Sequence, residues 1–456
     1  MSKIKSINPW TSKLLGEFDL LTQEQIDTKT DAAAKAFATW KDLPISDRAV
    51  LMKKAGKILR KNQEQYARLI TAEMGKVIRE SRAEVEKCAW ACEYYADQTE
   101  GFLAPEEITL EDNKKANLFH QPLGVILAVM PWNFPFWQVF RFAAPTLMAG
   151  NTGILKHASN VPQCALAIES VFREAGFPEG VFQTFLIDSK ATLALLDKEE
   201  VKAVSLTGSE KAGAAVAAAA GKNIKKSLLE LGGSDPFIVL ADADIEKAAE
   251  IAVKGRMVNF GQSCIAAKRF IIEESVFDAF LELFIEKLSQ LKSGDPMDES
   301  SDYACMARPD LAAELFSQVK KSVEMGAKII LGSEQAKEGS AEFDPIILTD
   351  IAENSPAFTE ELFGPVATLF KVKNEEEAIK LANVTEFGLG ASLWTEDPKK
   401  GELLAAQIDS GAVFINAMVA SQPGLPFGGI KKSGFGRELG RQGILEFVNT
   451  KTVYLG

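Results

Sequence analysis

Short apolar runs alternate with amphipathic segments along most of this 456-residue chain. Apolar runs bounded by turn residues predict buried strands, and apolar residues spaced three or four apart predict helices. The expected strands include GVILAVMP, TGILKHA, VKAVSLTG and PFIVLAD, and the expected helices include 161–175 and 209–220. Strands alternating with helices are typical of a doubly wound, mostly parallel sheet, so the pattern predicts an α/β protein.

A second alternating block follows Gly232–Gly233. It contains a predicted helix over 277–291 and predicted strands AKIILG, FDPIILT, PVATLFKV, LGASLWT and GAVFIN. The residues before the first block, 22–102, have a helical pattern that begins with a capping box formed by Thr22 and Gln25. We therefore expect two doubly wound, Rossmann-like domains.

Two polar, alternating segments lie outside these blocks. EITLEDNKKANLFHQ predicts an exposed hairpin, and ILEFVNTKTVYLG predicts a final strand. Strands left outside two α/β domains have unpaired edges, which favours pairing with another copy of the chain. We therefore expect a small β oligomerisation flap in a homodimer or homotetramer.

Charge and cysteine content exclude several classes of protein. A net charge of -12 disfavours binding to nucleic acid or to an anionic membrane. The five cysteines are scattered and odd in number, which indicates a reduced, cytoplasmic chain. The start of the chain has no targeting pattern. The long apolar stretch 124–150 is interrupted by Pro131, Asn133, Pro135 and Arg141, so we expect a buried strand, a turn and a helix rather than a membrane span.

Cys264, in the segment VNFGQSCIAAKRF, is the first candidate for chemistry. Gly261 allows a tight backbone before it, and Lys268 and Arg269 supply positive charge that favours a thiolate. The alternative is a small buried hydrophobic side chain. With only two histidines in the chain, a base for this thiol is expected among the carboxylates.

Three polar side chains end apolar runs and are candidates for supporting roles. Glu230, in LLELGG, would have its pKa raised by apolar surroundings to a value useful for a general base; a solvated or salt-bridged glutamate is the alternative. Asn133, held between two prolines, can donate to an oxyanion. Lys156 lies where parallel sheets bind ligands, and the helix that follows Gly208 and Ser209 can face a phosphate.

In chain order, seven motifs resemble the NAD(P)-dependent aldehyde dehydrogenase family, from Ile7 to the last strand: PWNFP, LKHAS, LTGSEKAG, LELGG, GQSC, EELFGP and PFGGIKKSGFGRE. The resemblance implies that Cys264 attacks an aldehyde, with Asn133 and the Cys264 backbone N–H as the oxyanion hole. Glu230 then activates the water that hydrolyses the thioester. Because members that transfer the acyl group to coenzyme A typically lack this glutamate, we expect a free acid as product.

The resemblance also implies a dinucleotide cofactor and no metal. Lys156 and Glu361 would hold the ribose hydroxyls, and Ser159 stands where many NAD-preferring members carry a glutamate that repels a 2'-phosphate. We therefore expect NADP to be preferred and NAD to be possible. The implied cofactor contacts are Trp132, Asn133, Lys156, His157, Ala158, Ser159, Gly208, Ser209, Leu231, Glu361 and Phe363.

The expected substrate is an aldehyde that carries a carboxylate. Arg141 would lie on the helix lining the aldehyde tunnel, and a buried arginine without a nearby acid needs an anion. Arg141 and Ser421 resemble the carboxylate-binding pair of the succinate semialdehyde dehydrogenase branch. Val258 stands where some relatives carry a second arginine, and Ala266 where some carry a second cysteine used as a redox switch; no such switch is expected here.

Several alternatives remain at this point. Arg141 can instead pair with a distant acidic residue. Glutarate semialdehyde or a neutral aliphatic aldehyde can be the substrate, or the fold can persist in a non-catalytic structural protein. The expected division of the chain is a cofactor-binding domain at 1–103 and 123–232, a catalytic domain at 233–433, and the oligomerisation flap at 104–122 and 434–456.

Overall fold

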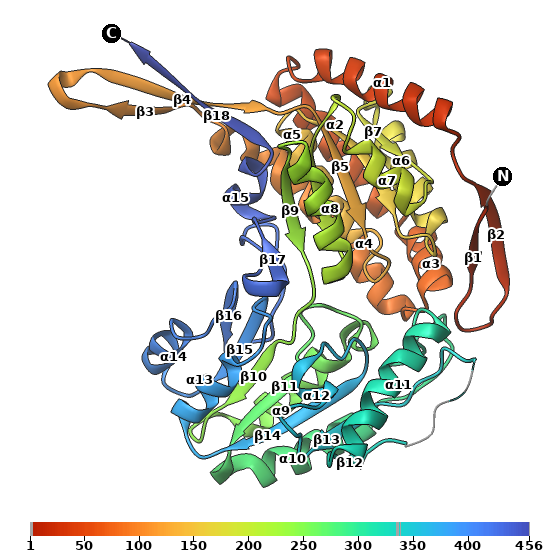
Figure 1. The fold of residues 1–456 in the computed structure, drawn as a ribbon, viewed down its shortest axis with the longest axis vertical. Coiled ribbons are helices and arrows are strands. Elements are labelled where there is room, and N and C mark those ends of the chain that lie inside the picture. The colour runs from red at the N-terminus through yellow and green to blue at the C-terminus, as the bar shows by residue number, and fades with distance from the viewer. Residues whose placement is uncertain (1–2, 334–336, 338, 456) are drawn as a thin grey trace.

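The computed structural model describes residues 3–333, 337 and 339–455. Two open, twisted sheets lie one above the other in Figure 1, each flanked by helices, and a thin β arm projects from the upper part. The α/β class predicted from the hydrophobic pattern is confirmed, and so is the parallel character of both sheets.

The upper sheet has six strands in the order β17-β9-β8-β5-β6-β7, and all pairings except β17 with β9 are parallel. The chain winds from β5 outward to β7 and then returns to the other edge of β5 at β8. This reversal is the point at which doubly wound sheets bind ligands, beyond the carboxyl ends of the strands. The strands are β5 (Val125–Met130), β6 (Thr152–His157), β7 (Phe182–Thr184), β8 (Val201–Thr207), β9 (Lys226–Glu230) and β17 (Gly434–Phe435).

Helices from two parts of the chain cover the upper sheet (Figure 1). Their apolar faces form a continuous core with the strands, which includes Trp40, Tyr95 and Phe140. The helices that precede the sheet are α1 (Gln23–Trp40), α2 (Ile45–Lys61), α3 (Gln63–Met74) and α4 (Ile78–Phe102). The helices between its strands are α5 (Trp137–Met148), α6 (Pro162–Ala175), α7 (Ser189–Leu195) and α8 (Glu210–Lys222). The capping box predicted for Thr22 and Gln25 begins α1.

The lower sheet has seven strands in the order β12-β13-β14-β11-β10-β15-β16, parallel except for the edge strand β12. Its strands are β10 (Pro236–Val239), β11 (Arg269–Glu273), β12 (Lys328–Leu331), β13 (Ile346–Thr349), β14 (Val366–Val372), β15 (Gly390–Trp394) and β16 (Ala412–Ile415). Its helical elements are α9 (Ile245–Met257), η2 (Val258–Gly261), α10 (Glu274–Ser289), α11 (Pro309–Glu324), α12 (Pro356–Thr359), α13 (Glu375–Asn383) and α14 (Pro398–Ala405).

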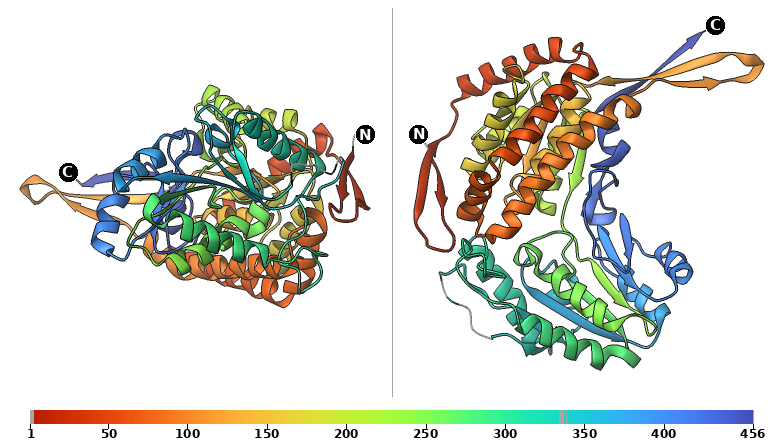
Figure 2. Two further views of the ribbon diagram at one scale, coloured as in Figure 1. Left: turned by 90° about the horizontal axis from the view of Figure 1, so that it is seen from below. Right: turned by 180° about the vertical axis from the view of Figure 1, so that it is seen from behind.

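The arm is a three-stranded antiparallel sheet in the order β18-β4-β3, and both views in Figure 2 show it projecting from the body. It consists of β3 (Glu106–Thr109), η1 (Glu111–Asn113), β4 (Lys115–Pro122) and β18 (Val448–Leu455). The predicted hairpin and final strand are therefore present. The flap was expected to resume at residue 434, which is wrong: β17 pairs with β9 of the upper sheet instead. The glycines of GFG allow this close backbone approach, because a Cβ on Gly434 would meet the backbone of Leu229.

Three smaller features complete the chain. A separate hairpin of β1 (Lys3–Ile7) and β2 (Leu14–Asp19) begins it, and η3 (Lys431–Ser433) and α15 (Gly440–Leu445) flank β17. The apolar stretch 124–150 forms β5, a turn and α5, as predicted. Within the described ranges, no helix combines the length and apolar character that a membrane crossing requires.

Candidate active site

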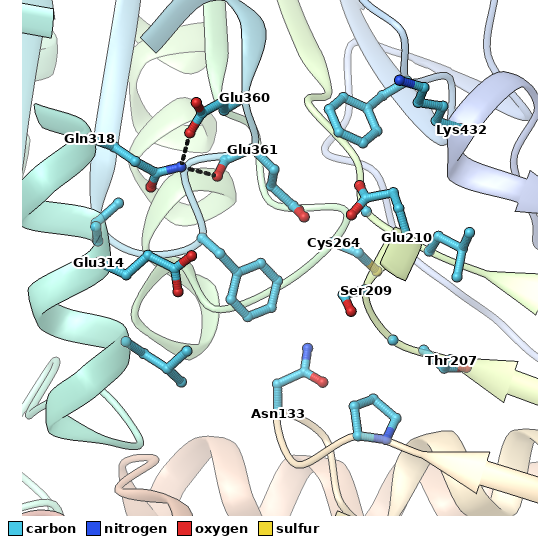
Figure 3. A pocket seen from close by; sticks show the side chains of 18 of the residues that line it. Asn133, Thr207, Ser209, Glu210, Cys264, Glu314, Gln318, Glu360, Glu361 and Lys432 are labelled. Atoms are coloured by element: carbon cyan, nitrogen blue, oxygen red, sulfur yellow. Dashed lines mark hydrogen bonds between the residues drawn. The ribbon is translucent and has the colours of Figure 1, made fainter. Parts of the chain in front are cut away.

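A cavity of about 630 Å³ lies between the two sheets, at the carboxyl ends of the upper strands and the amino ends of the lower strands. From the upper sheet it is lined by residues that follow strands, such as Asn133 after β5 and Ser209 after β8. From the lower sheet it is lined by residues that precede strands, such as Cys264 before β11 and Phe363 before β14. Figure 3 shows Asn133 and Cys264 facing this cavity from different sheets.

The loop that carries Cys264 begins with three consecutive residues in the left-handed region: Asn259 (φ 51°), Phe260 (φ 54°) and Gly261 (φ 73°). This backbone is costly for residues other than glycine, so the surroundings must hold it in place. The Asn259 backbone N–H donates to the Glu80 carboxylate, and its side-chain amide donates to the carbonyl of Asn133 at 2.7 Å. The strained turn is therefore tied to both α4 and the loop that holds Asn133.

Lys268 determines the path of the chain on the other side of Cys264. Its ammonium donates to the carbonyls of Ser263 (2.9 Å), Cys264 (2.9 Å) and Ala266 (3.2 Å), and it forms an ion pair with Glu361. Lys268 is buried, so these bonds are made in a medium of low dielectric constant. The loop is folded around Lys268, and the three hydrogen bonds from this lysine make the loop rigid.

The positive charge predicted beside Cys264 does not bring the pKa of its thiol below the ordinary value. Cys264 is half-buried, and burial raises the pKa of its thiol to about 12, although the charges of Arg141 and Lys268 lower it. Arg269 points away from the thiol and donates to the carbonyls of Leu381 and Ala382. Successive side chains of a strand point to opposite faces, so Lys268 and Arg269 cannot both face the same loop. In this structure the thiol is held as the neutral form.

Two N–H groups are free to bind an oxygen beside Cys264. The Asn133 amide donates one N–H to the Gln262 carbonyl at 3.0 Å and accepts a hydrogen bond from Gln138, which leaves its second N–H free. The backbone N–H of Cys264 makes no hydrogen bond within the described part of the chain. Two such donors are what an oxyanion hole requires.

Glu230 ends β9 with its carboxylate buried. Its backbone is held by pairing with Gly434 of β17, and its carbonyl accepts from the Gly208 N–H at 3.0 Å. Among the described residues, neither carboxylate oxygen has a hydrogen-bond donor. Burial raises the pKa of Glu230 well above its usual value, while Arg141 lowers it and Glu438 raises it. The direction of this shift agrees with the sequence prediction and suits a general base.

Most of the predicted cofactor contacts lie on the cavity. The Trp132 and Phe363 rings meet edge to face with centroids 5.9 Å apart. Ser209 caps α8, the helix whose first turn borders the same space, and its hydroxyl accepts from the Ala212 N–H. The predicted contacts that line the cavity are Trp132, Asn133, Gly208, Ser209, Leu231, Glu361 and Phe363.

The last residues of β6 and the segment after it carry the other predicted contacts and do not line this cavity. Lys156 is half-buried, and burial lowers its pKa; among the described residues it has neither a hydrogen bond nor an ion pair. Ser159 is exposed and Ala158 is half-buried. The His157 ring lies between the carbonyls of Met130 and Pro135, and burial lowers its pKa to about 4. The His157 side chain is thus neutral, and both of its ring nitrogens lie in hydrogen-bond contact with the protein backbone.

Arg141 has an acidic partner, so the expectation that it lacks one is wrong. Its guanidinium forms a buried ion pair with Glu438, donates to Thr207 at 3.2 Å and lies over the Phe427 ring. Glu438 lies far along the chain, on the loop before α15, and is brought beside α5 only by the fold. The alternative left open by the sequence, pairing with a distant acid, is the observed arrangement. This pairing leaves Nη1 of Arg141 without a hydrogen bond among the described residues, so an additional anion has room to bind there.

Sequence reasoning missed the roles of two charged residues whose partners lie far away in the chain. Glu438 is the last residue of the motif PFGGIKKSGFGRE, but nothing in the sequence indicates that it reaches Arg141. Lys87, on α4, donates to the Ser421 hydroxyl at 3.0 Å across 334 positions of the chain. Only Ser421 of this pair was a candidate. Across the described residues, no group of three or more His, Cys, Asp or Glu side chains is arranged to hold a metal ion.

A thiol, a buried carboxylate and free N–H donors between two doubly wound sheets define an enzyme that forms a covalent bond to a carbonyl substrate. The model of the aldehyde dehydrogenase family matches residues 1–453. The chain belongs to the aldehyde dehydrogenase family.

Individual relatives are similar over the whole chain. The probable succinate-semialdehyde dehydrogenase (NADP+) of Synechocystis sp. is 52% identical over 452 residues, which is 99% of both chains. The succinate semialdehyde dehydrogenase (NAD(P)+) of Escherichia coli is 46% identical over 98% of this chain and 97% of its own. The crystal structure of succinic semialdehyde dehydrogenase from Streptococcus pyogenes with NADP+ has a TM-score of 0.97 at 36% identity and covers 99% of each chain.

Proposed function

We propose that this protein oxidises succinate semialdehyde to succinate with NADP as the preferred oxidant. The observation that supports the oxidation is the arrangement at Cys264: a thiol on a rigid loop, two free N–H donors and the buried Glu230 carboxylate. The substrate is supported by full-length relatives that are named for it.

The chain's own groups supply both covalent steps. The Cys264 sulfur attacks the aldehyde carbon as the thiol proton passes to solvent water, and the carbonyl oxygen becomes an alkoxide that the Asn133 amide and the Cys264 N–H stabilise. When bound, the nicotinamide cofactor accepts the hydride that this carbon gives up, which leaves a thioester on Cys264. Glu230 takes a proton from water, the water oxygen attacks the thioester carbon, and the carbon–sulfur bond breaks to release the acid.

The end of β6 and the residues after it fit a phosphorylated cofactor. Lys156 is a half-buried cation without an anionic partner among the described residues, and its charge is costly there unless a ligand supplies one. Ser159, three residues further on, adds no carboxylate that would repel a 2'-phosphate. Asp188, the acid whose charge acts on Lys156, already accepts from the Ala191 N–H at the start of α7.

The kinetic test of the substrate compares three aldehydes with NADP. We expect kcat/KM for succinate semialdehyde to exceed that for butanal by at least roughly a hundredfold, because a site built for a polar group rejects an analogue without it. Glutarate semialdehyde, one methylene longer, is expected to be roughly tenfold poorer. Equal efficiency with butanal would contradict the proposed substrate.

Replacing Ser159 with glutamate is expected to shift preference toward NAD. The new carboxylate would repel a 2'-phosphate and accept a hydrogen bond from a ribose hydroxyl, so KM for NADP should rise by roughly 10- to 100-fold. Ser159→Gln is the matched control, because it adds the same bulk without charge. If both variants weaken NADP binding equally, the effect is steric and the charge argument fails.

We also propose that the arm mediates homo-oligomerisation in the cytoplasm. Its outer strands β18 and β3 carry exposed apolar side chains, including Ile108 and Tyr454. Within the described part of the chain, the outer edges of β18 and β3 pair with no further strand, which supports pairing with a second copy.

A further inference from the structure

Lys87, Trp137 and Ser421 form a polar cluster that the proposed reaction has not yet used. Lys87 comes from α4, Trp137 from the first turn of α5, and Ser421 from the loop after β16. The Ser421 oxygen accepts from Lys87 Nζ at 3.0 Å and from Trp137 Nε1 at 2.9 Å. The ammonium also lies 4.2 Å from the centroid of the Trp137 ring.

The Ser421 hydroxyl has a hydrogen-bond donor that is not used among the described residues. A serine hydroxyl accepts two hydrogen bonds and donates one. Both acceptor positions of Ser421 are taken by Lys87 and Trp137, and its own O–H has no acceptor among the described residues. Ser421 is buried, so an unused donor there is costly. A ligand that accepts hydrogen bonds would satisfy it.

The charge of Lys87 also favours an anionic ligand at this cluster. Lys87 has no ion pair within the described ranges. Glu84, one turn before it on α4, is already bound by Lys76 and by the N–H groups at the start of α5. Arg141, the largest charge acting on Lys87, is paired with Glu438. Lys87 is therefore the uncompensated cation of this region, and a single carboxylate would neutralise it.

The cluster adjoins the cavity that holds the reacting thiol. Gln138, the residue after Trp137 on α5, lines that cavity together with Cys264 and donates to the Asn133 side-chain oxygen at 3.0 Å. Trp137 and Arg141 are four residues apart on α5, so they lie on the same face of that helix. A short aldehyde bound at Cys264 can extend along this face toward Lys87.

We propose that Lys87, together with the Ser421 hydroxyl, binds the carboxylate of the substrate and determines selectivity for carboxylate-bearing aldehydes. This assignment rests on the proposed function. It makes Lys87 the first anchor of the carboxylate and leaves Arg141, already neutralised by Glu438, as a secondary contact. Aldehydes without a carboxylate gain nothing from Lys87.

The test replaces Lys87 with methionine, which keeps the length of the side chain and removes its charge. The ratio of kcat/KM for succinate semialdehyde to that for butanal is expected to fall by roughly 10- to 100-fold, mostly through KM for the semialdehyde. Lys57→Met is the matched control. Lys57 is exposed on α2 and has no ion pair or hydrogen bond in the described part of the chain.

A second measurement needs no variant. Burial lowers the pKa of Lys87 to about 8; the charges of Arg141 and, to a smaller extent, Lys76 also lower it, whereas Cys88 and Glu84 raise it. An anion favours the protonated lysine, so selectivity should be full below pH 8 and fall as pH rises through it, by up to about tenfold per pH unit. Taking the ratio between two aldehydes cancels the ionisation of Cys264, which both share.

The outcomes separate the two proposals. A wild-type enzyme that oxidises butanal as well as succinate semialdehyde would overturn the proposed function. A selective wild-type enzyme whose ratio is unchanged by Lys87→Met and flat between pH 7 and pH 9 would overturn only the role of Lys87. A fall in efficiency that is equal for both aldehydes would also overturn it, because it would reflect packing against Trp137 rather than recognition of charge.

Discussion

Replacing Cys264 with alanine is expected to abolish aldehyde oxidation, with kcat falling by at least roughly ten-thousand-fold. Without the sulfur there is no covalent adduct from which the aldehyde hydrogen can leave as hydride, and the free N–H groups have no alkoxide to stabilise. NADPH formation at 340 nm measures the loss. Binding of NADP should persist, because the proposed cofactor contacts in the cavity lie on other loops.

Cys305→Ala is the matched control for this loss. Cys305 is a buried cysteine on the loop before α11, away from the cavity. Its replacement should cost some stability but leave kcat within about twofold, since it removes only packing atoms. Activity that survives in Cys264→Ala, or that is lost equally in Cys305→Ala, would rule out Cys264 as the nucleophile.

Replacing Glu230 with glutamine is expected to slow turnover by about 10²- to 10⁴-fold while leaving acylation fast. Glutamine preserves the shape of the side chain but cannot take a proton from water. Rapid mixing should therefore show a burst of about one NADPH per active site, followed by a slow steady rate. The burst is the informative signal, because it separates hydrolysis of the thioester from its formation.

The pH dependence gives an independent check on Glu230. Its pKa is raised, and the base must be deprotonated, so the steady-state rate of the wild type should increase as pH rises through that pKa. This rise should be absent in Glu230→Gln. The exposed Glu199→Gln is the control and should behave as the wild type does. A Glu230→Gln variant with no burst would assign the glutamate to acylation instead.

Most of the strands could be predicted from the local pattern of apolar and turn residues. The apolar runs named as strands form β5, β6, β8, β10 and β12 through β16 except for small differences at their ends, because strand periodicity and turn residues act locally. Candidate residues that end apolar runs, such as Asn133 and Ser209, face the cavity because parallel strands place their carboxyl ends along one edge.

The exceptions arose where side chains meet across the fold. Arg141 was expected to lack an acid because none is close in sequence, yet Glu438 is buried against it. Lys268 and Arg269 were expected to activate Cys264 together, yet the pleat of the strand directs Arg269 to α13. Lys87 belongs to none of the motifs, and only the fold brings α4 beside the loop after β16 that carries Ser421.

The sequence by itself determined the α/β class and the succession of strands and helices along the chain, and its motifs predicted the thiol, the carboxylate and the amide proposed for the reaction. These follow from periodicity and from motifs whose residues act near their own strand ends. Only the tertiary structure decided which charges are neutralised. Burial makes an unpaired charge costly, so the partner of each cation depends on which distant elements pack beside it. Among the described residues, that packing leaves Lys87 rather than Arg141 without an acidic partner.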